Sequence, residues 1–228
     1  MGRLTFLGHS AFLIEGKGLR GIIDPFITGN PLAPLGVGEI EVDYIFVTHG
    51  HSDHLGDAVE IARRNDALII APYELAVYCQ SKGAKAHPMH IGGSHQFPFG
   101  RVKLTPALHG SAIVTDEGIT YTGQPCGFLI DVEGKTIYHA GDTGLFSDLS
   151  LIGERENIEV ALLPIGDNFT MGIMDAVYAA SLLRPKVVIP MHYRTFPVID
   201  QNPEEFKEHV ERLGMKCLIL EPGGSCEF

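Results

Sequence analysis

The most informative part of the chain is the run Tyr44-Ile45-Phe46-Val47-Thr48-His49-Gly50-His51-Ser52-Asp53-His54-Leu55-Gly56. It begins with apolar and β-branched residues, as a buried strand does, and passes into a helical pattern. Between the two, four side chains that can bind a metal ion occur within six positions, in the order His-x-His-x-Asp-His. Imidazole and carboxylate together suit zinc, iron, manganese or nickel. The run therefore predicts a metal site at the end of a strand.

The spacing within this motif favours two ions. His49 and His51 stand two residues apart on an extended turn, so both can face one ion. Asp53 and His54 are adjacent and enter the helix, which suits a second ion. Gly50 is expected to let the backbone turn tightly between the two histidines. A single histidine in a loop is ordinarily interpreted as a solvated side chain. This interpretation does not account well for four potential metal ligands within six positions.

Three further candidate ligands come later, each directly after an apolar strand pattern. They are His109 in Thr105-Pro106-Ala107-Leu108-His109-Gly110, Asp142 in Tyr138-His139-Ala140-Gly141-Asp142-Thr143-Gly144, and His192 in Val188-Ile189-Pro190-Met191-His192-Tyr193. Each alone could be structural. Catalytic groups concentrate on loops at strand ends, where a rigid scaffold holds them. We therefore expect the three residues to join the four of the central motif.

The rest of the pattern predicts strands that pass into an alternation of strands and helices. Strands are expected at Leu4–Leu7, Ala11–Ile14, Gly21–Ile23, Tyr44–Val47, Leu68–Ile70, Val102–Thr105, Gly127–Val132, Thr136–His139, Val160–Pro164, Val187–Pro190 and Lys216–Leu220. Helices are expected at Leu55–Arg64, Glu74–Lys82, Met174–Leu183 and Pro203–Leu213. This pattern indicates two sheets packed together with helices outside. No repeat or linker marks a boundary, so residues 1–228 are expected to form a single domain.

Composition argues against several classes of protein. The 228 residues are 45% hydrophobic and 20% charged, which predicts a sizeable core. No apolar stretch reaches the roughly 18 residues of a membrane span, and the N-terminus leads directly into a strand pattern, so we expect a cytoplasmic protein. A net charge of -11 without a basic run argues against nucleic-acid binding. The four cysteines form no CxxC pair and are expected to be reduced thiols.

The order of the metal-binding motifs resembles that of the metallo-β-lactamase superfamily. The whole chain is similar to a family of small metal-dependent hydrolases within it, and further matching segments are Phe6–Ser10, Ile23–Phe26, Gly166–Gly172 and Met191–Tyr193. More distant relatives include ascorbate-6-phosphate lactonase and the N-acylphosphatidylethanolamine phospholipase D enzymes. The chain departs from the family pattern at Arg194, where Asn is usual, and at Ile173-Met174, where Pro-Glu is usual. These departures bear on the substrate and touch none of the predicted ligands.

The resemblance implies an α/β (α+β) fold, namely an αββα four-layer sandwich of two mixed sheets with the metals at one edge. It implies that the first ion is held by His49, His51 and His109, that the second is held by Asp53, His54 and His192, and that Asp142 bridges both. Zinc β-lactamases of the familiar kind place a cysteine at the second metal. No cysteine lies near these motifs, so antibiotic hydrolysis fits poorly.

Three residues are predicted to assist the chemistry, which relies on a hydroxide that bridges the two metals. Metal binding lowers the pKa of water to about 7, so this hydroxide is available at neutral pH. Asp53 would ligate the second ion and accept a hydrogen bond from the hydroxide. Asp24 would orient a ligand histidine through its distal nitrogen, unless it only forms a turn before Pro25. His9 would protonate the leaving group or contact the substrate, unless it is a packed histidine at the sheet edge.

Other candidates are less specific. Asn168, Phe169 and Met171 join a strand to a helix, where they would face the substrate as an apolar wall and a hydrogen-bond partner, or simply pack. His139 is interpreted as orienting a ligand or as structural. The segment His87–His95 holds three histidines and is expected to be a loop, either ordinary or forming one wall of the pocket.

The predicted function is that of a binuclear metal-dependent hydrolase for a small ester, lactone, amide or phosphodiester. Zinc is the first expectation for both divalent ions, and the nitrogen and oxygen ligands would also accept manganese, iron or nickel. A small-molecule substrate is expected, with neither nucleic acid nor membrane as a partner, and a homo-oligomer is left open. The alternatives are a non-catalytic metal-binding or regulatory protein, a phosphodiesterase as the main activity, and a di-iron redox protein.

Overall fold

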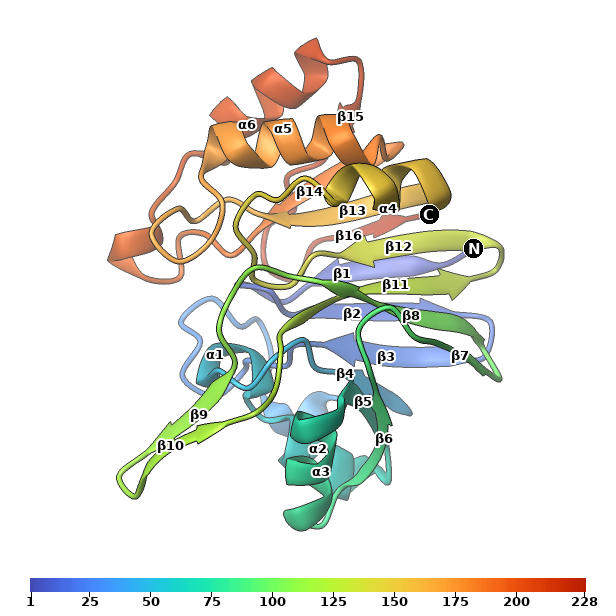
Figure 1. Cartoon of the computed structure of the whole chain (residues 1–228), viewed down its shortest axis with the longest axis vertical. Helices are drawn as coiled ribbons and strands as arrows, with labels where there is room; N and C mark the ends of the chain where they lie inside the picture. The colour runs from blue at the N-terminus through green and yellow to red at the C-terminus, as the bar shows by residue number, and fades with distance from the viewer.

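Two seven-stranded sheets pack face to face in the computed structural model, which describes residues 1–228 (Figure 1). In spatial order, the first sheet holds β16 (Ser225–Glu227), β1 (Arg3–Phe6), β2 (Phe12–Gly16), β3 (Leu19–Ile23), β4 (Tyr44–Phe46), β5 (Leu68–Pro72) and β6 (Lys85–Met89). The second holds β15 (Lys216–Cys217), β14 (Val187–Met191), β13 (Ile158–Pro164), β12 (Lys135–His139), β11 (Cys126–Val132), β8 (Gly100–Pro106) and β7 (Ser94–Phe97).

Helices cover the outer face of each sheet. On the first sheet lie α1 (Ser52–Leu55), α2 (Ala58–Asn65) and α3 (Tyr73–Ser81), and on the second lie α4 (Leu149–Arg155), α5 (Ile173–Leu183) and α6 (Pro203–Arg212). Short 3-10 helices occur at Val37–Glu39 and Pro197–Ile199. The predicted αββα sandwich is confirmed. None of the helices has both the length and the apolar character needed to span a bilayer.

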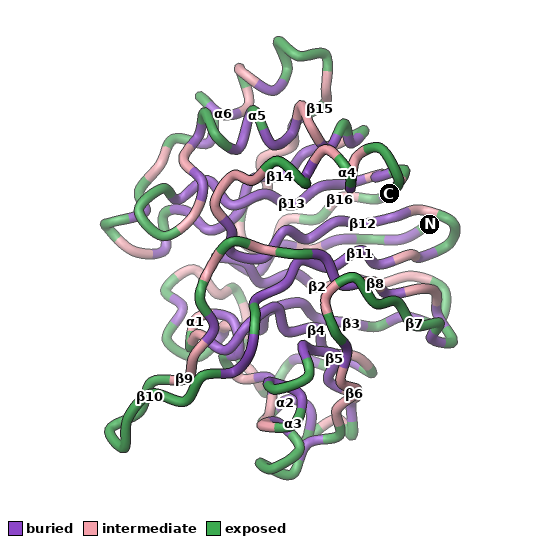
Figure 2. The backbone as a smooth tube through the Cα atoms, viewed as in Figure 1, coloured by how far each residue is buried: buried purple, intermediate pink, exposed green.

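The core lies mainly between the sheets, where central strands such as β11, β12 and β13 are almost entirely buried (Figure 2). One cluster of 44 buried residues fills this layer and extends beneath α5 and α6. In it Phe46 of the first sheet meets Phe128 of the second edge-on, with ring centroids 5.6 Å apart. A second cluster of 19 residues packs α2 and α3 against the first sheet. Because strands with both faces covered must be apolar throughout, β11 reads as an almost continuous hydrophobic run.

The parallel strands of both sheets determine where the site forms. In the first sheet β3, β4, β5 and β6 are parallel, and in the second β12, β13, β14 and β15 are parallel. Asp24 and His49 follow β3 and β4, while Asp142 and His192 follow β12 and β14. The carboxyl ends of these strands meet at one edge of the sandwich, so residues far apart in the chain become neighbours.

The helix predicted at Leu55–Arg64 is wrong in extent, because the structure has α1 and α2 in its place. The chain breaks at Gly56, which has φ +41° and lies so close to Pro25 that a Cβ would overlap its carbonyl oxygen. The loop predicted at His87–His95 is also wrong, since His87 belongs to β6 and His95 to β7. Both are edge strands, where a proline such as Pro88 and polar side chains are tolerated.

Besides β16 and the short 3-10 helices, a hairpin and a helix were not predicted at all. The hairpin of β9 (Ala112–Thr115) and β10 (Gly118–Tyr121) projects away from both sheets, and α4 covers the second sheet. Every residue of β10 is exposed, so the hairpin has no buried face to impose an alternating pattern.

Candidate metal centre

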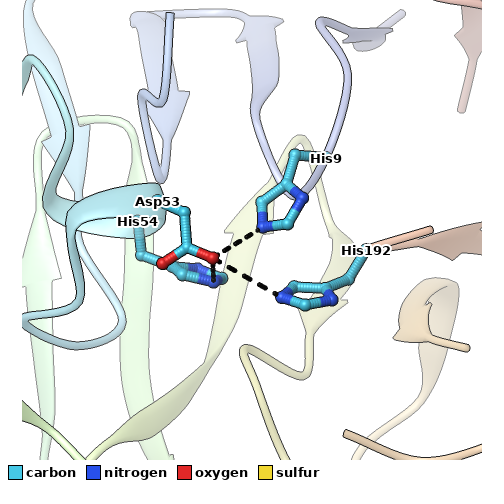
Figure 3. A group of neighbouring side chains, drawn as sticks. All are labelled: His9, Asp53, His54 and His192. Carbon is cyan, nitrogen blue, oxygen red and sulfur yellow. Dashed lines mark hydrogen bonds and ion pairs between the residues drawn. The ribbon is translucent and has the colours of Figure 1, made fainter. Parts of the chain in front are cut away.

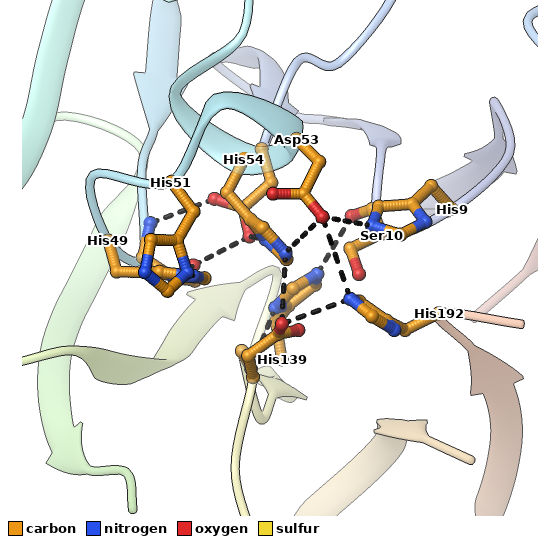
Figure 4. Close-up of polar contacts among 12 residues, drawn as sticks. His9, Ser10, His49, His51, Asp53, His54, His139 and His192 are labelled. Carbon is orange, nitrogen blue, oxygen red and sulfur yellow. Dashed lines mark hydrogen bonds and ion pairs between the residues drawn. The ribbon is translucent and has the colours of Figure 1, made fainter. Parts of the chain in front are cut away.

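All seven predicted ligands converge at this edge of the sandwich. Figure 4 labels five of them, namely His49, His51, Asp53, His54 and His192. The ligand atoms of His49, His51 and His109 lie within 4.8 Å of one another, and so do those of Asp53, His54 and His192, together with His9. A third group of His49, His54 and Asp142 connects these two sets. The seven residues come from four separate segments, which follow β4, β8, β12 and β14, and the fold brings these segments together.

Asp142 lies between the two sets of ligands. Its Oδ2 atom is 3.2 Å from Nε2 of His54, 3.0 Å from Nε2 of His192 and 3.5 Å from Nε2 of His109. His54 and His192 belong to one set and His109 to the other. The carboxylate is therefore placed where it can contact two ions at once. Figure 3 shows Asp53 facing His9, His54 and His192 on the other side.

The spacing of the nitrogen atoms fits a metal ion. Nδ1 of His51 is 2.9 Å from Nε2 of His49 and 3.2 Å from Nε2 of His109. Nitrogen ligands at roughly 2.0–2.1 Å from a tetrahedral zinc ion lie about 3.3 Å apart. Three rings that aim nitrogen atoms at one another across this distance are arranged as a ligand set is.

Buried polar atoms without partners give independent support for this fit. His54 Nε2, His192 Nε2 and Asp142 Oδ1 are buried and form no hydrogen bond, and the two nitrogen atoms face Asp142 Oδ2 at 3.2 and 3.0 Å. Leaving such an atom unsatisfied costs about 1–3 kcal/mol each, so an arrangement of several together is unfavourable unless something binds them. Divalent cations satisfy this donor set, because neutral imidazoles and carboxylates are the ligands they take.

Asp24 and Thr48 hold the ligand histidines in the tautomers that a metal requires. The hydroxyl group of Thr48 donates to Asp24 Oδ2 (2.7 Å) and therefore accepts from Nδ1–H of His49 (2.9 Å). Nδ1–H of His54 donates to the same oxygen of Asp24 (2.8 Å). Both rings thus carry their proton on Nδ1 and leave Nε2 free. The predicted contact between Asp24 and a ligand histidine is present, and Thr48 was not foreseen.

Burial keeps most of these imidazoles neutral, which is the form that binds metals. It lowers the pKa of His51 and His109, and lowers that of His49 well below the usual range. The pKa of His54 is raised instead: burial lowers it, but the carboxylates of Asp142 and Asp24 outweigh burial. The raised pKa favours a second ring proton, on Nε2 of His54, which a metal ion bound there would have to displace. Metal affinity should therefore fall as the pH falls.

His9 is fully buried beside the second set and has both ring nitrogens engaged. Nε2–H donates to Asp53 Oδ2 (3.1 Å), and Nδ1 accepts from the hydroxyl group of Thr195 (2.9 Å). Its carbonyl oxygen accepts from the backbone N–H of His192 (2.7 Å). The residue has φ +59°, a left-handed conformation that is uncommon outside glycine and recurs at functional sites. Burial lowers the pKa of His9 to about 4, so its ring is neutral at pH 7.

The open side of the site is formed by the partly exposed residues His51, Asp53 and His109. Gly50 does not have the left-handed backbone of a tight turn. It is instead required because a Cβ there would overlap the side chain of Thr122. Phe26 and Phe196 flank His9 edge-on at 5.6 Å each and form an apolar wall that sequence analysis did not identify.

The remaining predicted residues, Asn168, Phe169, Met171 and His139, do not belong to the candidate ligand sets. Met171 is 1% exposed and belongs to the main hydrophobic core, so it packs and does not face solvent. Phe169 is 51% exposed, and Asn168 is exposed beside it. His139 is buried, donates from Nε2 to the carbonyl oxygen of Ser10 (3.0 Å) and accepts from the N–H of Gly141 (3.1 Å). It therefore supports the loop that carries Asp142.

The chain is similar to known proteins over its whole length. A family model described as "Beta-lactamase superfamily domain" matches residues 3–192. A UPF0173 metal-dependent hydrolase of Anoxybacillus flavithermus is 58% identical over 227 residues, which cover 99% of this chain and 100% of that protein. Another, from Pelotomaculum thermopropionicum, is 56% identical over 228 residues, with the same coverage of 99% and 100%.

Solved structures also match the fold of this chain. Igni18, a novel metallo hydrolase from the hyperthermophilic archaeon Ignicoccus hospitalis, matches with a TM-score of 0.90 at 43% identity, covering 100% of this chain and 99% of that one. An isothiocyanate hydrolase from Delia radicum gut bacteria matches with a TM-score of 0.79 at 22% identity, covering 99% and 98%, and shows the shared fold. By its family match and by its relatives along the full length, the chain belongs to the beta-lactamase superfamily and, within it, to the metal-dependent hydrolases.

Proposed function

We propose that this protein is a binuclear metal-dependent hydrolase of the cytoplasm that cleaves a small ester, lactone, amide or phosphodiester. The observation that carries the proposal is the position of Asp142, whose single Oδ2 atom lies within 3.5 Å of histidines from both ligand sets. A site for one ion would have no use for a second complete set of ligands. His49, His51 and His109 would hold one ion, Asp53, His54 and His192 the other, and Asp142 both.

Two divalent ions, if bound by these residues, would supply a nucleophile at neutral pH and stabilise negative charge on a carbonyl or phosphoryl oxygen. The chain itself positions the reacting groups. Asp53 is partly exposed and accepts a hydrogen bond from Nε2–H of His9, so this bond links the open side of the site to a buried ring. Asp24 fixes the direction of two ligand rings through His54 and Thr48. Phe26 and Phe196 limit the access of water to His9.

The surroundings of the site support a small substrate. A groove of about 470 Å³ lies beside His109, and its lining includes Leu108, Ser111 and Tyr121. We call this the inner groove. A space of this size suits a small molecule, since ligand pockets are typically about 300–1,000 Å³. Zinc is proposed for both ions on the strength of the histidine-rich ligand set.

The test combines metal content with turnover. Protein purified without chelator would be analysed for metals by mass spectrometry and assayed against p-nitrophenyl esters, lactones and bis-p-nitrophenyl phosphate. We expect close to two ions per chain. His51→Ala should remove one ion, and Asp142→Ala should weaken both, with turnover lowered by at least about 10³-fold in each variant.

The outcomes separate the alternatives. Hydrolysis of the phosphate diester alone would identify a phosphodiesterase. Two ions without turnover of any of these compounds would favour a metal-binding protein without catalysis. Protein that contains no metal and cannot be reconstituted would overturn the proposal. If the purified native protein contained iron and showed a visible absorption band, the result would instead support a di-iron redox centre.

A further inference from the structure

A second groove continues the inner groove away from the metal centre. It measures about 360 Å³, and we call it the outer groove. Ile91, Tyr121 and Gln124 line both grooves. Because the two share these walls, a molecule that reaches the ligand His109 in the inner groove can extend into the outer one. The base of the β9–β10 hairpin forms one side of this path, and the turn between β6 and β7 forms the other.

The outer groove carries a single formal charge. Among the residues that line the two grooves, Glu74 is the only acidic residue, and none is a lysine or arginine. Glu74 takes part in no ion pair. Its carboxylate therefore leaves an uncompensated negative charge at the end of the path. A phosphate or carboxylate on a substrate would be repelled there, and a cation would be attracted.

Two ring-bearing side chains line the same groove as Glu74. Tyr121 and His90 line the outer groove, and Tyr73 stacks on His90 with ring centroids 5.3 Å apart and planes 6° from parallel. Aromatic faces attract ammonium groups, by about 0.5–1 kcal/mol at exposed sites. A carboxylate and a tyrosine ring that line one groove form a combination that can recognise an organic cation.

A simpler explanation accounts for only part of this arrangement. Glu74 lies in the first turn of α3, where an acidic residue stabilises a helix through the helix dipole. The helix dipole explains why an acidic residue occurs at this position, but it does not explain the close contact between Glu74 and Gly123. Gly123 has φ +84° and presses against Glu74 so closely that a Cβ would overlap Oε2, with Cδ at 3.0 Å. In the structure the carboxylate therefore lies directly against the backbone of Gly123, at the wall of the groove.

We propose that the outer groove is a subsite for an ammonium group of the substrate, and that Glu74 is the residue that selects it. The proposal rests on the proposed function, because it assumes that substrates reach the site along this path. It narrows the substrate class to esters, lactones or amides that bear an amine or quaternary ammonium group a few bonds from the cleaved bond.

The first test measures binding and does not depend on turnover. Choline and its neutral isostere 3,3-dimethyl-1-butanol would be titrated into the metal-loaded, isotopically labelled protein, with amide chemical shifts as the readout. We expect choline to shift the amides of Ile91, Gly123 and Gln124, and to bind about fivefold more tightly than the alcohol. Glu74→Gln should abolish this difference. Glu205→Gln is the matched control, because Glu205 is also exposed in the first turn of a helix but lies in α6.

The second test measures selectivity. Thioesters of thiocholine and of 3,3-dimethyl-1-butanethiol with the same acyl group would be compared by kcat/KM in the native protein and both variants. We expect a preference of about fivefold for the choline compound, lost in Glu74→Gln and kept in Glu205→Gln.

The two tests can fail separately. Selective choline binding at these amides without turnover would uphold the subsite and count against the hydrolase. Turnover of both thioesters without preference, or binding of the alcohol as tight as that of choline, would overturn the subsite and leave the hydrolase standing. Shifts confined to amides elsewhere would overturn the subsite as well.

Discussion

Oδ2 of Asp24 lies 2.8 Å from Nδ1 of His54, and both side chains are completely buried. The same carboxylate group accepts from the backbone N–H and the hydroxyl group of Thr48, and that hydroxyl in turn accepts from His49. One buried acid therefore sets the tautomer of one histidine from each ligand set. Its influence on the metal centre should exceed that of any residue that contacts no ion.

Asp24→Asn should reduce metal affinity by about 10- to 100-fold while the protein stays folded. The asparagine amide can donate to Nδ1 of His54, which would move the ring proton to Nε2, where the metal has to bind. Competition with a chelator would measure the affinity. Asp57→Asn is a matched control, because Asp57 accepts from the N–H groups of Ile27 and Thr28 and contacts no ligand histidine. Equal losses in the two variants would contradict the role given to Asp24.

His9→Asn should leave the metal content unchanged and lower turnover by about 10²-fold or more. Both ring nitrogens of His9 are occupied, by Asp53 and Thr195, so no lone pair remains for a metal even though the ring lies among the second set of ligands. Asparagine is chosen because it tolerates the left-handed backbone at this position. Metal analysis and steady-state rates would be measured on the same preparation. A loss of one ion per chain would show instead that His9 is a ligand.

The candidate ligands could be predicted from the sequence because few residue types bind metals and because each follows an apolar strand. Their supporting residues could not. Thr195 contacts His9 across 186 positions of the chain, and a threonine carries no signal that would mark it among the others. Thr48 directly precedes His49, but a threonine gives no sequence signal of this supporting role either. Hydrogen bonds between frequent residue types that lie far apart in the sequence can be identified only from the folded structure.

Segments without a buried face were the least predictable parts of the fold. In the β9–β10 hairpin, Val114 and Ile119 are 70% and 75% exposed. The sequence therefore has no hydrophobic periodicity there that would predict the hairpin. Met171 and Phe169 stand two residues apart in one loop, yet one is in the core and the other on the surface. In a loop, the backbone determines which of two apolar side chains turns inward, and composition does not.

The cysteines should be unreactive in the folded protein. Burial raises the pKa of the Cys79 and Cys217 thiols to about 12 and that of Cys126 well above its usual range. A raised pKa means that the protonated thiol persists as the pH rises, so at pH 8 only about one Cys79 or Cys217 side chain in 10⁴ would be the reactive thiolate. Cys226 is only partly buried.

A titration with Ellman's reagent at pH 8 should therefore show at most one slowly reacting thiol per chain, assigned to Cys226 by its loss in Cys226→Ser. All four thiols should react at once in guanidinium chloride. Rapid reaction of two or more thiols in the native protein would contradict this account, and fewer than four after unfolding would reveal a disulfide.

Gly141→Ala should disturb the metal centre through the backbone alone. Gly141 precedes Asp142, has φ +63°, and leaves no room for a side chain: a Cβ would lie 2.5 Å from the carbonyl oxygen of Cys126 and 3.2 Å from the side chain of Thr48. The left-handed backbone costs about 1–2 kcal/mol for alanine, and relief of the overlap would also move Asp142 away from both ligand sets. For a chain of this size that cost corresponds to a decrease in Tm of about 2–8 °C, measured by calorimetry.

Gly144→Ala provides the comparison within the same loop. Its nearest neighbour would be the carbonyl oxygen of Leu108 at 3.9 Å, an ordinary contact, and its φ lies outside the left-handed region. We expect Gly144→Ala to keep both its Tm and two ions per chain, and Gly141→Ala to lose metal as well as stability. If Gly141→Ala lost stability but bound metal with native affinity, Asp142 would not need the position that the structure gives it. The bridging role of its carboxylate would then have to be abandoned.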